Sequence, residues 1–560
     1  MKIIAESAFN HNGSYEYLVK LAKAAKDSGA DYFTVQVMDA KVFSTKDYSK
    51  YQLYIDNEIS ANNWKKLFDV CKKLELPVIP CALDENSFDL CYKYGFRFFK
   101  LHATDITNEP FLKYITSKGN CSFILETQVA TLMDIQFALN ILKDKVECLM
   151  TGYSNYPTEV EDLNINVIDT FKKEYPYKVG YADHSTDVEN IPLMLLAKGC
   201  DFLEKHITLT RNNRNFDWQV SLYPEQFSQM VSSIRYYTKA LGNGVKHPSV
   251  NELKYRDVIY KKVVKGEKTL KRSDTGEDYL SHQVKTFDKT NVTIALIARL
   301  KSKRLPLKVL KPFCSGALIS DLYFRLKTSK RSKSLFLATS YLPEDHGLVD
   351  IASENKMKVF LGHPVSVIDR LLGQAFANKA GAIFRVTGDN PLTDPYLMDK
   401  MIELYLKHNL DYVRVLNVPF GVSCELFSTK YLWKLYLKMD NPMNSEYLSW
   451  FIINDNDCRR GAIDFQCKKK NLKYLNLSID YPEDYARALK LLKAIGKKNA
   501  TEISLKDIVD NSDSLDIESK DKEIKLPGGV TVSFDRYLNI LADMDYVSVE
   551  KLKYEDLPDR

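Results

Sequence analysis

The stretch KVGYADHSTDVENIPLMLLAKGCDFLEKH, residues 178–206, decides the fold of the first half of the chain. Two short β-rich runs, KVGYA and FLEKH, stand at its ends, and the apolar segment between them has helical length. A strand, a helix and a second strand in this order make one β–α–β unit of a parallel sheet. Polar residues follow each run at the point where the strand ends, so this unit is also a candidate site.

The same alternation extends back to the N-terminus. Further strand candidates lie at 2–6, 32–37, 77–82, 96–101, 122–127 and 147–151, with helix-period segments between them. Eight strand–helix repeats in roughly 240 residues predict a (β/α)₈ TIM barrel over residues 1–245. A doubly wound sheet is the rival, but it usually has fewer strands and commonly opens on a Gly-rich phosphate turn, which this sequence lacks.

The remainder of the chain divides into three segments by composition. Residues 246–290 are polar and basic and are predicted to be a linker. A β-run, NVTIALIARL, opens renewed α/β alternation over 291–500, which predicts a second, Rossmann-like α/β domain. Residues 501–560 begin with an acidic linker and end in a predicted small hairpin-plus-helix element of unknown role.

Composition narrows the class of protein. Of 560 residues, 45% are hydrophobic and 27% charged, which suits folded globular domains. A net charge of +6 without a Lys/Arg stripe argues against a nucleic-acid partner. No apolar run reaches bilayer length, so no membrane partner is expected. The cysteines are scattered without a CxxC pair, so reduced thiols and a cytoplasmic location are expected.

Polar residues recur where the predicted barrel strands end. The positions are Glu6, Gln36, Lys100, Glu126, Asp183, His184, Glu204 and His206. In a barrel of this kind the chemistry lies at the carboxyl ends of the strands. His184 and His206 end neighbouring strands, so we expect their imidazoles to share a divalent metal ion. The structural alternative is a rim of satisfied ion pairs.

Five segments resemble the sialic acid synthase family across nearly all of the first 245 residues: AESAFNHNGS, TGYSNYPTEVEDLNI, VGYADHS, FLEKHITLTR and FDWQVSLYPEQFSQMV. That family condenses phosphoenolpyruvate with an N-acetylated hexose to give a nine-carbon 2-keto-3-deoxy acid. The resemblance implies that His184 and His206 bind Mn²⁺ or Mg²⁺. It implies catalytic roles for Glu6, Glu204 and Lys100, the last on the phosphate. Further substrate contacts are implied at Gln36, Asp105, Ser154, Tyr156, Asp183 and Asp217.

The sequence also departs from that family. Thr34 stands where the family usually has a lysine, ETQ (126–128) replaces an STG run, and Ala182 replaces a serine. After KKVVKGEKTL the sequence does not continue into the family's antifreeze-like domain, which lends an arginine to the partner subunit. These departures leave open a degenerate barrel that binds a sugar acid without making one.

A second candidate site begins with a basic loop, ARLKSKRLPLK, residues 298–308. It brings together Arg299, Lys301, Lys303, Arg304 and Lys308. Several cations after one strand suit a triphosphate, although a solvated basic loop is the simpler alternative. Asp389 and Asp480 end two later strands, and such paired carboxylates suit a Mg²⁺–triphosphate complex.

The patterns ARxxSxRLPxK, GDxP and DxPED, in this order over about 291–490, resemble the cytidylyltransferase family that includes CMP-Kdo synthetase and acylneuraminate cytidylyltransferase. The resemblance implies that Arg299, Arg304 and Lys308 act on the triphosphate and that Asp389 and Asp480 bind Mg²⁺. It places Ser302 on a substrate and Glu425 near the sugar. Leu307 stands where the family usually has a glycine.

Together the two resemblances predict a bifunctional enzyme for a CMP-activated, sialic-acid-like sugar. Its substrates are expected to be phosphoenolpyruvate, an N-acylated hexose and CTP, and a homodimer is expected. The alternatives are an active cytidylyltransferase beside a degenerate barrel, and an assembly scaffold with neither site active.

Overall fold

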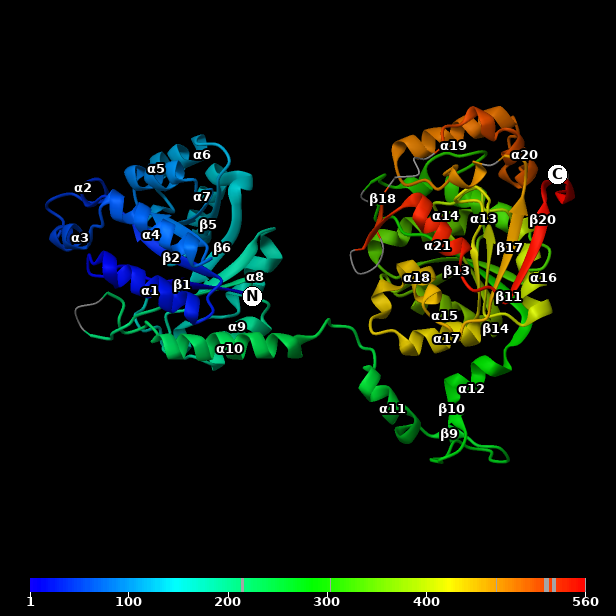
Figure 1. The fold of residues 1–560 in the computed structure, drawn as a ribbon, viewed down its shortest axis with the longest axis horizontal. Coiled ribbons are helices and arrows are strands. Elements are labelled where there is room, and N and C mark those ends of the chain that lie inside the picture. The colour runs from blue at the N-terminus through cyan, green and yellow to red at the C-terminus, as the bar shows by residue number, and fades with distance from the viewer. Residues whose placement is uncertain (213–215, 303, 470, 518–522, 526–529, 559–560) are drawn as a thin grey trace. The chain divides into compact units, whose positions relative to one another are not determined.

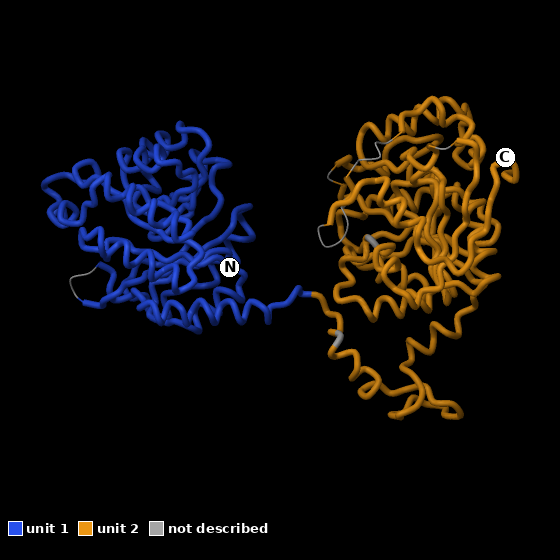
Figure 2. The backbone as a smooth tube through the Cα atoms, in the orientation of Figure 1, with its two compact units in different colours: residues 1–244 blue, residues 245–560 orange. Residues whose placement is uncertain are grey.

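The computed structural model describes the chain except residues 213–215, 303, 470, 518–522, 526–529 and 559–560. It divides into two compact units, residues 1–244 and 245–560, coloured separately in Figure 2.

Unit 1 is a closed barrel of eight parallel strands that pair in chain order (Figure 1). The strands are β1 (Lys2–Glu6), β2 (Tyr32–Val37), β3 (Val78–Ala82), β4 (Phe98–Leu101), β5 (Ser122–Glu126), β6 (Val146–Gly152), β7 (Lys178–Ala182) and β8 (Phe202–His206). The main helices between and after them are α1 (Tyr15–Asp27), α4 (Ala61–Lys73), α5 (Glu85–Tyr94), α6 (Glu109–Ser117), α7 (Leu132–Leu142), α8 (Val167–Glu174), α9 (Asn190–Ala197) and α10 (Pro224–Leu241). The predicted (β/α)₈ fold is confirmed.

The barrel helices form because their apolar residues recur at helical spacing. In α1, Leu18, Leu21, Ala22 and Ala25 are buried on one face. The side chain of Ser14 accepts a hydrogen bond from the backbone N–H of Tyr17 and caps the first turn of this helix. The helices therefore cover the barrel with one apolar face each.

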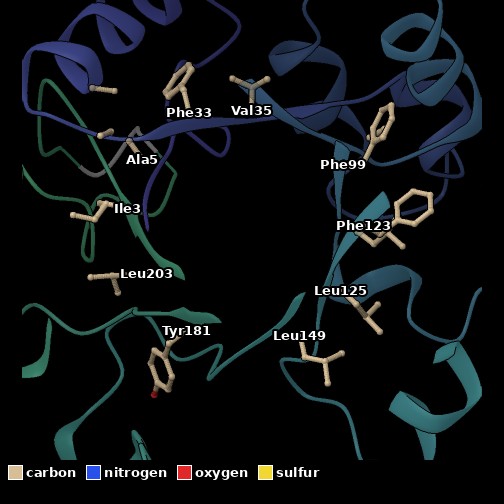
Figure 3. Packing of buried hydrophobic residues seen from close by; sticks show 14 of the residues in the cluster. Ile3, Ala5, Phe33, Val35, Phe99, Phe123, Leu125, Leu149, Tyr181 and Leu203 are labelled. Carbon is tan, nitrogen blue, oxygen red and sulfur yellow. The ribbon is translucent and has the colours of Figure 1, made fainter. Parts of the chain in front are cut away.

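Alternation along the strands separates two kinds of barrel residue. Phe33, Phe99 and Tyr181 point away from the ring of strands into the layer beneath the helices (Figure 3). The residues that alternate with these along the strands face the barrel interior, where Ile4, Ile124 and Phe202 belong to a small apolar cluster. Two residues further along the same strands the inward positions are Glu6, Glu126 and Glu204. The barrel interior is thus apolar at one level and charged at the carboxyl ends of its strands.

Unit 2 is built on an eight-stranded mixed sheet in the order β13-β12-β11-β14-β16-β15-β17-β20. The strands are β11 (Asp288–Ile297), β12 (Ser334–Ser340), β13 (Val359–Gly362), β14 (Ala380–Thr387), β15 (Tyr412–Leu416), β16 (Glu425–Ser428), β17 (Arg460–Gln466) and β20 (Ser548–Lys553). Only β16 runs antiparallel to its neighbours in this sheet as described. Its main helices are α13 (Leu318–Leu326), α14 (His346–Glu354), α15 (Val367–Asn378), α16 (Pro395–His408), α17 (Thr429–Lys438), α19 (Pro482–Ile495), α20 (Leu505–Asp510) and α21 (Phe534–Ala542). The predicted second α/β fold is confirmed.

The segments at the two ends of unit 2 are structured. Ahead of the sheet lie α11 (Val250–Ile259), an antiparallel pair formed by β9 (Lys262–Val263) and β10 (Glu277–Asp278), and α12 (Tyr279–Thr286). At the other end, β20 pairs in parallel with β17 and extends the main sheet. The C-terminal residues are thus part of the sheet that carries the second site.

Within the described part of the chain, no helix combines the length and the apolar character needed to cross a membrane.

Arg325 generates a stability prediction for unit 2. Its buried guanidinium pairs with Asp394 at 3.1 Å and donates to the carbonyl oxygens of Thr393, Ala500 and Ile503. Arg325→Met would leave these groups buried without the guanidinium, so we expect a loss of about 3–5 kcal/mol in urea unfolding. Arg331→Met, which breaks a surface pair, is the control and should cost less than about 1 kcal/mol. Similar losses in both variants would contradict this account.

Candidate active sites

The barrel site is centred on one buried lysine. The Nζ atom of Lys100, on β4, lies 2.8 Å from Glu6 Oε1, 3.0 Å from Glu126 Oε1 and 3.0 Å from Glu204 Oε1. All four side chains are almost fully buried. Gln36 donates to the same Glu6 oxygen at 3.2 Å. Three carboxyl groups around one ammonium leave the cluster with an excess of negative charge, unless protons or a cation offset it.

The three glutamates differ in their pKa values. Burial and the charge of Glu6 raise the pKa of Glu204 well above its usual range, so Glu204 is the glutamate of this cluster that holds a proton most readily. Burial alone would raise the pKa of Glu6 as well. The positive charge of Lys100 has the opposite effect and prevails, so the pKa of Glu6 is lowered. One carboxyl group with a raised pKa, Glu204, and two with lowered pKa values, Glu6 and Glu126, therefore stand beside the same ammonium, which suits acid–base chemistry.

Two imidazoles lie beside this cluster. The rings of His184 and His206 are 5.2 Å apart between centroids, and His206 Nε2 is 3.6 Å from Glu6 Oε2. Burial lowers the pKa of His206 to about 3 and also lowers that of His184, so both rings are neutral. Neutral imidazole is the form that binds metal ions.

The hydrogen bonding of the two rings fits a metal ion. His184 Nδ1 lies 2.7 Å from the carbonyl oxygen of Tyr153, which fixes the tautomer and leaves Nε2 as the acceptor. Both ring nitrogens of His206 are buried without a hydrogen-bond partner among the described residues. No group of three or more His, Cys, Asp or Glu side chains in the described ranges is arranged to hold a metal by itself. A metal here would therefore need water or substrate as further ligands.

Other predicted barrel residues lie at differing distances from this centre. Asp183 is fully buried but pairs with Lys205 at 2.7 Å, so the structure does not bring it into the glutamate cluster. The ring of Tyr156 packs at a tilt against that of His184, with centroids 4.6 Å apart, while the nearby Ser154 is exposed. Asp105 is buried and accepts from Asn108. Burial and the charge of Glu6 raise the pKa of Asp217 to about 6.

The second site is a cavity of about 670 Å³ at the carboxyl ends of β11 and β14. Its lining includes Arg299, Lys301, Ser302, Arg304 and Lys308 from the basic loop. Lys303 lies outside the described residues. Lys308 Nζ is 2.8 Å from Asp389 Oδ2 and 2.9 Å from Asp480 Oδ1, so one ammonium holds the two predicted Mg²⁺ ligands together.

Arginines that the sequence analysis did not select also line this cavity. Arg370, on α15, is buried, and its Nε and Nη1 atoms have no hydrogen-bond partner among the described residues. Burial lowers its pKa to about 10, and the nearby Arg299 contributes. Unpaired guanidinium groups in a cavity are suited to an anion with several charges, such as a triphosphate. Nothing in the sequence pointed to this role, because Arg370 stands within an ordinary helical pattern at residues 367–378.

The loop geometry and Glu425 complete this site. Leu307, in place of the family's glycine, adopts a left-handed conformation with φ 53°, which costs a non-glycine residue about 1 kcal/mol. Arg304 lies 3.3 Å from Asp480 and over the ring of Tyr481. Glu425 pairs with Arg385, another arginine that sequence analysis missed. The sequence did offer one signal for Arg385, because a charged residue stands within the strand-like run FRVT, residues 384–387.

The geometry defines two classes of site: a barrel centre with neutral imidazoles and clustered carboxyls, and a cationic nucleotide-type cleft. Comparisons agree with this division. Residues 21–246 match the NeuB family, and residues 293–508 match the family described as Cytidylyltransferase. The chain belongs to both families and is a fusion of a sialic-acid-type synthase domain and a cytidylyltransferase domain, both enzymes in their relatives.

Individual relatives cover parts of the chain. The N,N'-diacetyllegionaminic acid synthase of Campylobacter jejuni is 33% identical over 291 residues, which is 49% of this chain and 86% of the relative. That of Legionella pneumophila is 29% identical, over 47% of this chain and 79% of the relative. The structure of a cytidylyltransferase from Leptospira borgpetersenii is 25% identical and covers 40% of this chain and 94% of its own, with a TM-score of 0.37.

The lysine-centred cluster generates a pH-dependent prediction. Lys100→Met would leave three buried carboxyl groups without their ammonium, so we expect a loss of about 3–5 kcal/mol at pH 7 in urea unfolding. Without Lys100 the pKa values of the three glutamates rise above those in the unfolded chain, so the native state binds more protons. The loss should therefore shrink as the pH falls from 7 to 5. Lys113→Met, at an exposed pair with Glu109, is the control. A loss that grows on acidification would contradict this assignment.

Proposed function

We propose that this chain makes and activates a nonulosonic acid. The barrel would condense phosphoenolpyruvate with an N-acylated hexose, and unit 2 would transfer CMP from CTP to the resulting acid. The observation that carries the proposal is that one chain holds both sites, because a 2-keto acid made in the first is the kind of acceptor activated in the second. The names of the synthase relatives support the substrate class. By the same resemblance we propose a homodimer.

In the barrel, C3 of phosphoenolpyruvate would bond to the aldehyde carbon of the hexose, water would add at C2, and phosphate would leave. A Mn²⁺ or Mg²⁺ ion held by His184 and His206 would supply Lewis-acid polarisation of the aldehyde. Glu204, whose pKa is raised, would protonate the aldehyde oxygen as it becomes a hydroxyl group. Glu6 stays ionised and holds Lys100 in the site.

In unit 2, the anomeric hydroxyl of the acid would attack the α-phosphate of CTP, and pyrophosphate would leave. Mg²⁺ on Asp389 and Asp480 would neutralise charge on the phosphates. The cavity lining contributes six cationic side chains, Arg299, Lys301, Arg304, Lys308, Arg370 and Arg385, against the carboxylates of Asp389, Asp480 and Glu446. This excess of positive charge suits a triphosphate.

One observation favours a second candidate for the barrel, a module that binds a sugar acid without making one. The Lys100 ammonium is already paired with three carboxyl groups, and Thr34 stands where the family usually supplies another lysine. Phosphate release decides between the two functions. Pyrophosphate production from CTP and a supplied acid, without phosphate release from phosphoenolpyruvate, would favour the binding module.

The first functional prediction concerns His206. With Mn²⁺, phosphoenolpyruvate and a panel containing N-acetylmannosamine and related N-acylated hexoses, we expect sugar-dependent phosphate release. His206→Gln should reduce it by about 100-fold or more, because a metal ligand is lost. His346→Gln, at an exposed position in unit 2, should leave it unchanged. Wild-type protein that releases no phosphate across the panel would contradict the synthase assignment.

The second functional prediction concerns Asp389. Asp389→Asn should reduce CTP-dependent pyrophosphate release by roughly 100- to 1,000-fold, because it weakens both the Lys308 contact and the proposed Mg²⁺ site. Asp457→Asn, at an exposed ion pair with Lys434, should retain full activity. Equal activity of the two variants would remove Asp389 from the mechanism.

A further inference from the structure

A smaller cavity of about 160 Å³ adjoins the triphosphate cleft and shares Arg385, Thr387 and Tyr537 with it. Its other walls come from β15, β16, the segment at 417–424 and α21. Among its lining side chains, Arg385, Arg414 and Lys473 are cationic and only Glu425 is anionic. The cavity is therefore a pocket with largely apolar walls and an excess of cationic side chains, next to the place where CTP is proposed to bind.

Three adjacent strands bring the charges of this pocket together. Arg385 on β14 lies directly opposite Glu425 on β16. The pairing of Val413 with Leu426 between β15 and β16 then places Arg414 beside Glu425 from the other side. Arg385, Glu425 and Arg414 thus form a row across the sheet, with one carboxylate between two guanidinium groups.

That carboxylate already accepts three hydrogen bonds. Arg385 Nη1 lies 2.8 Å from Glu425 Oε2, while Tyr412 OH and Ser449 Oγ each donate to Oε1 at 2.7 Å. Glu425 therefore neutralises Arg385, and three donors occupy most of its acceptor sites. It is better suited to position Arg385 than to bind a sugar hydroxyl directly.

Arg414 feels the charge of Glu425 but forms no direct ion pair with it. No salt bridge joins it to a carboxylate in the described part of the chain, and its buried Nε and Nη1 atoms have no hydrogen-bond partner there. Buried guanidinium N–H groups without an acceptor are costly, whereas a carboxylate can satisfy them through two parallel hydrogen bonds. The side chain lines the cavity, so an anionic ligand there would provide the missing partner.

Helix α21 forms the remaining wall of the pocket, through Tyr537, Leu538, Leu541 and Ala542. It lies beyond residues 293–508, the part that matches the cytidylyltransferase family. Phe534 packs edge-on against Phe420 with ring centroids 5.8 Å apart, and Tyr474 OH donates to Asp535 at 2.5 Å. The helix is therefore held against the segment at 417–424 and the turn that contains Tyr474.

Tyr537 connects this helix to the charged row. It lines both cavities and interacts with Arg414, Arg385 and Glu425, and its hydroxyl has Ser449 as a hydrogen-bond neighbour. The side chain therefore stands between the proposed triphosphate cleft and the smaller pocket.

We propose that α21 completes the acceptor pocket of unit 2, in which Arg414 binds the carboxylate of the acid and Tyr537 positions the acid toward the nucleotide. This inference rests on the proposed nucleotidyl transfer and extends it in two ways. It makes a free carboxylate the recognised feature of the acceptor, and it gives the C-terminal segment a role in selecting that acceptor.

The test compares binding of N-acetylneuraminic acid and N,N'-diacetyllegionaminic acid with binding of their C1 methyl esters, by calorimetry on the full chain. CTP binding is measured separately on each variant. The wild type should prefer the acid over its ester by roughly 10- to 100-fold, the effect of one charge-assisted hydrogen-bonded pair. Arg414→Gln should abolish this preference and leave CTP affinity within about twofold. Arg414→Lys, which keeps the charge but loses the planar fork, should restore part of it.

Tyr537→Phe should raise the acceptor KM with little change in the KM for CTP. Tyr554→Phe, which removes a hydroxyl from the same C-terminal segment outside the pocket lining, is its matched control. Equal binding of acid and ester by the wild type, no binding of either acid, or an unchanged preference in Arg414→Gln would overturn the inference. Failure of the wild type to bind CTP would instead count against the proposed function. Failure of the acceptor-pocket inference and failure of the proposed function are therefore distinguishable.

Discussion

Side chains on a strand alternate between the two faces of a sheet, and both sites of this protein depend on that constraint. In the barrel it brings Glu6, Glu126 and Glu204 inward at one level, two residues beyond the apolar positions Ile4, Ile124 and Phe202. In unit 2 it aligns Arg385, Glu425 and Arg414 across three neighbouring strands. The chemistry in each unit lies where this alternation meets the carboxyl end of a sheet.

Charge compensation differs between the two sites. The barrel surrounds one ammonium with three carboxyl groups and two neutral imidazoles, so it has an excess of negative charge and unused lone pairs. Unit 2 has the opposite excess: Nε and Nη1 of Arg370 and of Arg414 are buried without a hydrogen-bond partner among the described residues. Because buried charge is costly until it is paired, the first arrangement suits a cation and the second suits anions. Both fit the proposed use of a metal-bound aldehyde and a nucleoside triphosphate.

The fold was predictable because its signal is local and repeated. Each barrel strand was visible as a short β-rich run, and the predicted runs 2–6, 32–37, 178–182 and 202–206 coincide with β1, β2, β7 and β8. Lys308, Asp389 and Asp480 were selected from three separate motifs, and the structure places the lysine Nζ 2.8 Å from Asp389 and 2.9 Å from Asp480. The pairing of Asp183 with Lys205 was not visible, because strand-end position does not reveal the direction in which a side chain points.

The sequence by itself determined the order of elements, the two families and most of the polar residues at strand ends, because these depend on local pattern and on motifs of fixed spacing. Only the tertiary structure decided which of those side chains form ion pairs with one another. It set three glutamates on one lysine, joined Arg385 to Glu425, and left Nε and Nη1 of Arg414 without a hydrogen-bond partner among the residues that the structure describes. It also placed β20 in the main sheet and α21 on the smaller cavity beside the cleft. Strand order and long-range pairing determine these contacts, and neither can be inferred from the sequence of a single segment.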